Sequence, residues 1–399
     1  MSSLPKIDRV ALRVDEAIYL AIGFGNTYLV TTPEGNVVID TSMPEFAQWH
    51  VEVLKGMSAA PVRYIVLTHG HRDHTGGIPL WKEPTTKIIA QKELVELVKY
   101  HKRLEGFFAR REEAQFEQPD SATRPRAGIY SAQIRPTILF DQHYEFSLGG
   151  TRFELFHTPG ETPDHLTLWI PKYRAAFTGD NYYDSFPNLY TLRGTKPRWP
   201  LDYIDSLNKV LALKPALLLP GHGQPIHGEA AVAERVTRYR NAIRYVHDKV
   251  VRGMNEGKDV FESMRDIRLP PELDVGEGYG KLTWSVRGIY EGYAGWFDTN
   301  PASMYDVPAS AVYPEVVWLA GGPEAVTTLA FRAIARGNPV KALHLTNMAL
   351  AADGTHQPAL VVRLKALKSL RERSRNLNER GWLDSSIQEV KGKLSLPSR

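Results

Sequence analysis

Short apolar runs alternate with glycine, proline and aspartate turns along the first half of the chain. Examples are residues 18–22, 27–30 and 37–39, and the run at 62–68 is rich in β-branched side chains. Runs of this length and composition, bounded by turn residues, predict β-strands. We therefore expect the first half of the chain to form sheets of short, buried strands.

The pattern changes after His222. Residues 230–251 carry apolar side chains at helical spacing with charged residues between them, and residues 326–351 repeat this pattern on both sides of Gly337-Asn338-Pro339. Such spacing predicts helices, the second segment being two helices split at that turn. A length of 399 residues, 43% of them hydrophobic, is enough for two cores. We place an α/β domain at residues 1–230 and an all-α domain at residues 231–399.

Composition narrows the function classes. The chain has no cysteine, which excludes disulfides and thiolate metal ligands. Its net charge of +4, from 49 basic and 45 acidic residues, suits a small anionic substrate and gives no reason to expect a nucleic acid partner. No apolar run approaches ~18 residues and the N-terminus lacks a signal-peptide core, so we expect no membrane association and a cytoplasmic location. A processed secreted or periplasmic form would fit as well.

The segment from Thr68 to Gly77 carries the strongest chemical signal. His69, His71, Asp73 and His74 lie within six residues, directly after the strand-like run at 62–68. Isolated histidines usually lie on the surface or in hydrogen-bonded cores, and this chain has 13. A cluster of imidazole and carboxylate groups at this spacing is instead typical of a metal site.

Three downstream positions could complete such a site. His165 precedes an apolar run, Asp180 ends a short strand beside a glycine, and His222 follows a leucine-rich strand between two glycines. Each pattern alone is typical of an ordinary turn. Their order after a His-x-His-x-Asp-His motif makes the set specific.

With these motifs, the chain resembles the metallo-β-lactamase superfamily of dinuclear metal hydrolases over residues from about Val14 to His222. The resemblance implies a four-layer αββα sandwich. It also implies that Asp40 orients the ligands from outside the metal shell. One ion would be bound by His69, His71 and His165, the other by Asp73, His74 and His222, and Asp180 would bridge them.

This ligand set implies a reaction type. Two divalent ions roughly 3.5 to 4 Å apart can share a water, lower its pKa and supply hydroxide as the nucleophile. All the ligands are nitrogen or oxygen donors, which suit zinc best and also admit manganese, iron or cobalt. We expect two divalent ions, with Zn²⁺ as the preferred ion.

A second resemblance concerns the substrate and the assembly. The segment Asn188-Leu-Tyr-Thr-Leu-Arg-Gly194 and the helical sequence beyond Tyr279 are similar to the alkyl sulfatase branch of the superfamily, in which a helical dimerisation domain follows the hydrolase domain. The resemblance implies sulfate ester cleavage, a homodimer, and sulfate binding by Asn188 and Arg193, with Thr191 as a helper. An arginine fork beside an amide donor suits a tetrahedral anion.

The chain also departs from that branch. His165 and Asp180 stand where the branch usually has glutamates, Arg198 lies near the position of a histidine, and the sterol-carrier-like third domain is lacking. The alternatives are therefore a broader hydrolase acting on phosphoesters, phosphonates or lactones, and a metal-stabilised binding scaffold without activity. The scaffold explains the ligand set less well, because a structural site needs no bridging carboxylate.

Overall fold

The computed structural model describes residues 9–116 and 134–394, which divide into two compact units. Within the described residues, the first unit holds 9–110 and 134–290, and the second holds 111–116 and 291–394. Each unit has its own hydrophobic core.

Seven strands form the first sheet in the described part of the chain, and they lie side by side in sequence order. The first four strands pair antiparallel and the rest pair parallel, so a mixed sheet results. The strands predicted from the apolar runs are confirmed. Their bounds are β1 (Leu12–Arg13), β2 (Ile18–Ala21), β3 (Thr27–Thr32), β4 (Gly35–Ile39), β5 (Val62–Val66), β6 (Lys87–Gln91) and β7 (Ile138–Phe140).

Six described strands form the second sheet, in the order β13-β12-β11-β10-β9-β8. They are β8 (His143–Leu148), β9 (Thr151–His157), β10 (Leu166–Ile170), β11 (Ala175–Gly179), β12 (Leu217–Pro220) and β13 (Ile226–His227). Strands β11 and β12 pair in parallel, with Gly179 opposite Pro220. Because parallel strands end at the same edge, the residues that follow them meet there.

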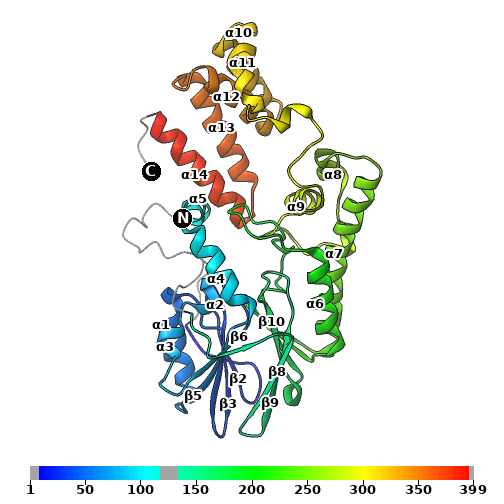
Figure 1. Ribbon diagram of the computed structural model, residues 1–399. Helices are drawn as coiled ribbons and strands as arrows, with labels where there is room; N and C mark the ends of the chain where they lie inside the picture. Colours follow the sequence, from blue (N-terminus) through cyan, green and yellow to red (C-terminus); the bar gives the residue numbers. More distant parts are fainter. Residues whose placement is uncertain (1–8, 117–133, 395–399) are drawn as a thin grey trace. The chain divides into compact units, whose positions relative to one another are not determined.

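The two sheets pack face to face around a shared core. Val37 and Ile39 belong to the cluster that contains Phe177 and Leu219 of the second sheet, whereas Val38 belongs to a cluster with the helices outside the first sheet. This alternation is the period of a strand that is buried on both faces. Figure 1 shows α1 and α3 on one side of the sheets and α6 and α7 on the other. The predicted αββα sandwich is confirmed.

The helices of the first unit range from the 4 residues of α2 and α3 to the 27 residues of α7. They are α1 (Pro44–Lys55), α2 (Arg72–Thr75), α3 (Ile78–Trp81), α4 (Glu93–Arg103), α6 (Pro200–Ala212), α7 (Glu229–Asn255), α8 (Val260–Asp266) and most of α9 (Leu282–Ala294), with 3₁₀ turns at Pro171–Tyr173 and Pro271–Leu273. Helix α5 (Glu105–Phe116) begins in this unit and ends in the second.

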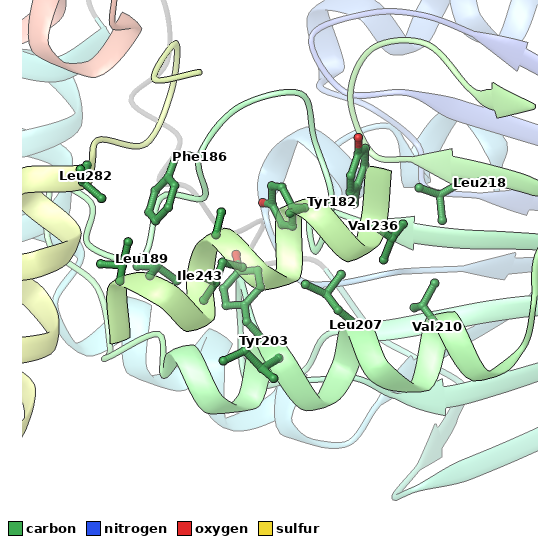
Figure 2. Packing of buried hydrophobic residues seen from close by; sticks show 14 of the residues in the cluster. Tyr182, Phe186, Leu189, Tyr203, Leu207, Val210, Leu218, Val236, Ile243 and Leu282 are labelled. Carbon is green, nitrogen blue, oxygen red and sulfur yellow. The ribbon is translucent and has the colours of Figure 1, made fainter. Parts of the chain in front are cut away.

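Helix α7 confirms the helix predicted at residues 230–251, and it packs on the sandwich. Its side chains Val236 and Ile243 share a core with Tyr203 and Leu207 of α6 and with Leu218 of β12 (Figure 2). The compact unit therefore continues to residue 290, beyond the boundary placed at residue 230. As a boundary between functional domains, residue 230 stays a prediction.

All the regular elements of the second unit are helical in its described residues. Its elements are the end of α5, 3₁₀ turns at Pro301–Met304 and Ala309–Val312, α10 (Tyr313–Leu319), α11 (Pro323–Ala335), α12 (Pro339–Ala352), α13 (Gln357–Arg373) and α14 (Leu377–Lys393). Helices α11 and α12 confirm the pair predicted around the Gly-Asn-Pro turn, and buried alanines such as Ala330 and Ala342 let them pack closely. None of the described helices is long and apolar enough to cross a bilayer.

Candidate active site

The histidine-rich segment begins directly after β5 and is held by close backbone contacts. His71 precedes the single turn of α2, which carries Asp73 and His74. A Cβ atom at Gly25 would lie 2.0 Å from the backbone oxygen of Asp73, so only glycine allows this approach. The chain at Gly25 and the turn of α2 therefore fit together without space for another side chain.

Asp40 orients the segment from the end of β4. One carboxylate oxygen accepts hydrogen bonds from the Thr68 hydroxyl (2.7 Å) and from His74 Nδ1 (2.8 Å), while the other accepts from the Thr68 amide (2.8 Å). With its Nδ1 proton engaged, His74 presents Nε2 as a lone-pair donor. This is the orienting role that the resemblance implied for Asp40, whose φ of 53° is unusual for a non-glycine residue.

Asp180 brings the two groups of candidate ligands together. Its Oδ1 lies 3.3 Å from His74 Nε2, and its Oδ2 lies 3.2 Å from His222 Nε2 and 3.8 Å from His69 Nε2. Asp73 Oδ2 lies 3.4 Å from His222 Nε2. Potential ligand atoms therefore form two clusters that share Asp180, one with Asp73, His74 and His222 and the other with His69 and His71.

His165 lies beside these clusters in a different arrangement. Its ring stacks on that of His69 with centroids 5.0 Å apart, and its Nε2 accepts a hydrogen bond of 3.1 Å from the Asp180 amide. In this orientation it belongs to neither cluster of converging ligand atoms among the described residues. Its assignment as a metal ligand stays a prediction.

Burial and mutual charge shift the pKa values of these groups in opposite directions. Burial lowers the pKa of His69 and that of His71 well below the usual range. For His74, burial is outweighed by the carboxylates of Asp180, Asp73 and Asp40, which raise its pKa. The pKa of Asp180 falls despite burial because His222 and His74 lie beside it. The neutral imidazoles of His69 and His71 and the ionised carboxylate of Asp180 are the protonation states that metal binding requires, whereas His74 has to release a proton when a metal binds.

The donor set fits divalent cations. His74 Nε2 and Asp180 Oδ1 are buried, and neither makes a hydrogen bond to any residue that the structure describes. A Cβ atom at Gly221 would lie 2.3 Å from Asp180 Oδ1, so a larger residue would occupy the space beside this oxygen. Buried lone pairs that converge without protons between them are stabilised by a cation, and nitrogen and oxygen donors suit zinc.

The predicted anion-binding segment is buried in the same unit. The amide N–H of Asn188 donates to the Tyr183 hydroxyl oxygen (2.6 Å), and Arg193 Nη1 donates to the Thr191 hydroxyl oxygen (2.9 Å). Burial first, and then the positive charges of Arg198 and Arg193, lower the pKa of His71. The positive charge of Arg193 therefore acts on His71 in the ligand cluster. The hydrogen bond to Thr191 orients the Arg193 side chain.

Sequence reasoning missed a buried polar network next to this segment. Arg198 forms an ion pair with Glu161, which also accepts a hydrogen bond from the Tyr203 hydroxyl (2.9 Å). The Glu161 amide donates to Asn181 Oδ1 (3.0 Å), directly after Asp180. The two charged side chains are 37 positions apart and each lies in an ordinary-looking loop sequence, so no local pattern signals the pair.

Comparison with known proteins identifies the family. A family model of the metallo-beta-lactamase superfamily matches residues 20–222. The chain belongs to this superfamily. A second family model, alkyl sulfatase dimerisation, matches residues 259–393. The superfamily and the helical dimerisation domain expected from the motifs are both confirmed.

Relatives of this metallo-beta-lactamase superfamily member are named as sulfatases. A linear primary-alkylsulfatase of Pseudomonas sp. is 31% identical over 391 residues, covering 92% of this chain and 74% of that protein. An alkyl/aryl-sulfatase of Saccharomyces cerevisiae is 29% identical, covering 86% of this chain and 58% of its own length. The chain thus spans less than two thirds of the yeast relative.

A solved structure shares the fold. The stereoselective inverting sec-alkylsulfatase Pisa1 of Pseudomonas sp. superposes with a TM-score of 0.86 at 22% identity, covering 98% of this chain and 66% of that one. A sequence identity of 22% supports a shared fold and nothing further. The sandwich and the helical region that follows it are therefore a known architecture.

Proposed function

We propose that this protein is a metal-dependent hydrolase that cleaves sulfate esters. The observation that carries the proposal is Asp180, which belongs to both clusters of potential ligand atoms, in a unit that also buries Asn188 and Arg193. The names of the sulfatase relatives support the same reaction class.

The cofactor is a pair of divalent ions, with Zn²⁺ as the expected metal. One ion would be held by His69, His71 and His165, the other by Asp73, His74 and His222, with Asp180 shared between them. When bound, such a pair lowers the pKa of water toward neutrality and polarises the ester group. Asp40 keeps His74 in the tautomer that can bind a cation, through the 2.8 Å hydrogen bond to its Nδ1.

The sulfate group is bound by the 188–193 segment. Asn188 supplies an amide whose nitrogen and oxygen are buried without a hydrogen-bond partner among the described residues. Arg193 supplies a permanent positive charge in a planar fork, held by Thr191. Binding an anionic group here neutralises its charge and orients the sulfur toward the ligand cluster.

The protein acts as a homodimer formed through its second unit. Large apolar side chains there are strongly exposed, including Trp296 (75%), Tyr305 (71%) and Trp318 (77%). Extensive exposed apolar surface is typical of an interface. The match to the alkyl sulfatase dimerisation model supports this assembly.

A broader hydrolase acting on phosphoesters, phosphonates or lactones is the second candidate. It is favoured by His165 and Asp180, which stand where alkyl sulfatases usually have glutamates. A more neutral ligand set would suit substrates that carry a different charge from a sulfate ester.

One screen separates the two candidates. Metal-reconstituted protein is assayed on matched 4-nitrophenyl sulfate, phosphate and phosphonate, on alkyl sulfates and on lactones, with metal-stripped protein as the control. We expect the highest kcat/KM on a sulfate ester and loss of activity without metal. A kcat/KM that is tenfold higher on a phosphoester or lactone would reject the sulfatase assignment.

A further inference from the structure

Arg198 is a buried guanidinium that is only half engaged. Its side chain and that of Glu161 are each 2% exposed, and the two form an ion pair through Arg198 Nη1. The same Nη1 donates to the backbone oxygen of Asn188 (2.9 Å). All the hydrogen bonds that the structure records for this guanidinium are therefore on one nitrogen.

The other two nitrogens are buried donors with nothing to donate to. Nε and Nη2 have no hydrogen-bond partner within the described parts of the chain, and both are shielded from solvent. Together they form the edge of the guanidinium that binds two oxygens of one oxyanion in parallel. Buried charged donors left unsatisfied are costly, so this edge points to a ligand that completes it.

The side chain of Asn188 shows the same deficit. Its Nδ2 and Oδ1 are buried and lack a partner in the described ranges, and its backbone oxygen is the atom that Arg198 holds. The two incomplete groups are thus linked by a direct contact.

We propose that Arg198 is a second anion-binding residue, which presents its Nε–Nη2 edge to two oxygens of the substrate's sulfate group. The proposal rests on the proposed function and deepens it. Glu161, which accepts a hydrogen bond from Tyr203, holds the guanidinium in place, while Arg193 and Asn188 bind from the neighbouring segment. The donors suit a group with three terminal oxygens, so the substrates are sulfate monoesters rather than neutral esters.

The competing explanation is that Arg198 only balances the charge of Glu161. The two explanations predict different effects of replacing Arg198 with lysine. Lysine keeps a positive charge for Glu161 but lacks the planar fork. Removing both charges with Arg198→Gln and Glu161→Gln avoids leaving one buried ion unpaired, which would destabilise the fold by itself.

The test measures the binding of inorganic sulfate to metal-loaded protein by titration calorimetry, together with kcat and KM on 4-nitrophenyl sulfate. The variants are Arg198→Lys and the double glutamine variant. The control is Arg240→Gln on α7, whose side chain bonds only to Asn208 and Asn241 among the contacts recorded for the described residues. Thermal melting verifies that each variant is folded.

We expect Arg198→Lys and the double variant to bind sulfate at least tenfold more weakly and to raise KM, while Arg240→Gln matches wild type. A folded double variant or Arg198→Lys that binds sulfate as wild type does would overturn the proposal. If wild type hydrolyses sulfate esters and the variants bind sulfate as tightly as wild type, only this inference is rejected. Wild type that cleaves no sulfate ester defeats the proposed function, and sulfate affinity still decides the role of Arg198.

Discussion

Replacing Asp180 should weaken metal binding at both clusters of ligand atoms, because both clusters include it. We predict that Asp180→Ala loses at least one of two bound ions and lowers kcat/KM by more than about 100-fold. Mutating residues that only hydrogen-bond to metal ligands already lowers activity by up to about 100-fold. Metal analysis of the purified variant, alongside the assay on a sulfate ester, tests this.

The matched control is Asp184→Ala, which removes a carboxylate with a 74% exposed side chain four positions away. It should keep both the metal content and the activity of wild type. Full activity in Asp180→Ala, or wild-type protein that is fully active with a single ion, would reject the two-ion site.

Arg193 should matter only for anionic substrates. We predict that Arg193→Ala lowers kcat/KM on sulfate esters roughly 30-fold to 1000-fold, or about 2 to 4 kcal/mol, because a charge-assisted contact in a buried pocket is lost. Any hydrolysis of a neutral lactone should be spared. Kinetics on both substrate classes provide the contrast, with circular dichroism and metal content checking the fold.

Equal losses on the two classes would make Arg193 a structural residue. Arg174→Ala serves as the control, because Arg174 is an exposed arginine that pairs with Glu229. Its kinetics should match those of wild type.

At the scale of an element, α1 is attached to the first sheet through a histidine that is buried in its neutral form. His50 is fully buried, with Nδ1 2.9 Å from the Thr27 hydroxyl. Burial lowers the pKa of His50 to about 3. The unfolded chain takes up this proton near pH 6.5, so folding stability from this group is complete above pH 6.5 and falls as the pH drops toward 3.

We predict that His50 accounts for about 3 kcal/mol of the stability lost between pH 8 and pH 4. Urea unfolding at both pH values, for wild type and His50→Gln, measures the difference in free energy of unfolding. The variant should show the shallower pH dependence. His227→Gln, which changes an exposed histidine on β13, should retain the slope of wild type. Parallel slopes in wild type and His50→Gln would contradict the prediction.

Elements with a strong local pattern could be predicted from the sequence. The apolar runs ending at Ile39 and Thr68 gave correct strands, and the helices around the Gly337 turn were correctly split. The convergence of Asp73, His74, Asp180 and His222 was implied by the resemblance to the superfamily, which rests on the order of their motifs along the chain.

What depends on three-dimensional packing was not predictable. Helix α7 carries a regular apolar stripe, and nothing local tells whether this stripe covers the sandwich or another helix. The pairing of Glu161 with Arg198 depends on two loops meeting, and the ring orientation of His165 depends on the Asp180 amide. These features arise from tertiary contacts, which cannot be predicted from the periodicity of apolar residues or from composition.

For the whole molecule, we predict a homodimer. Light scattering at micromolar concentration should give about twice the chain mass of 44.9 kDa, because an obligate interface persists at that dilution. Trp318→Glu, on the exposed surface of α10, should shift the protein toward single chains. Phe261→Glu is the control, since Phe261 is 61% exposed on α8 in the other unit. A wild-type mass near that of one chain would contradict the prediction.

The candidate ligands come from both sheets: His69 to His74 follow β5 of the first, whereas Asp180 and His222 follow β11 and β12 of the second. Ions bound between these ligands would link the two sheets. Activity and folding stability would therefore both depend on the concentration of available metal. At 100 times its dissociation constant, one bound ion adds about 2.7 kcal/mol to folding. We therefore expect EDTA to lower the Tm by several degrees and zinc to restore it, and protein made in metal-poor cells to be cleared sooner.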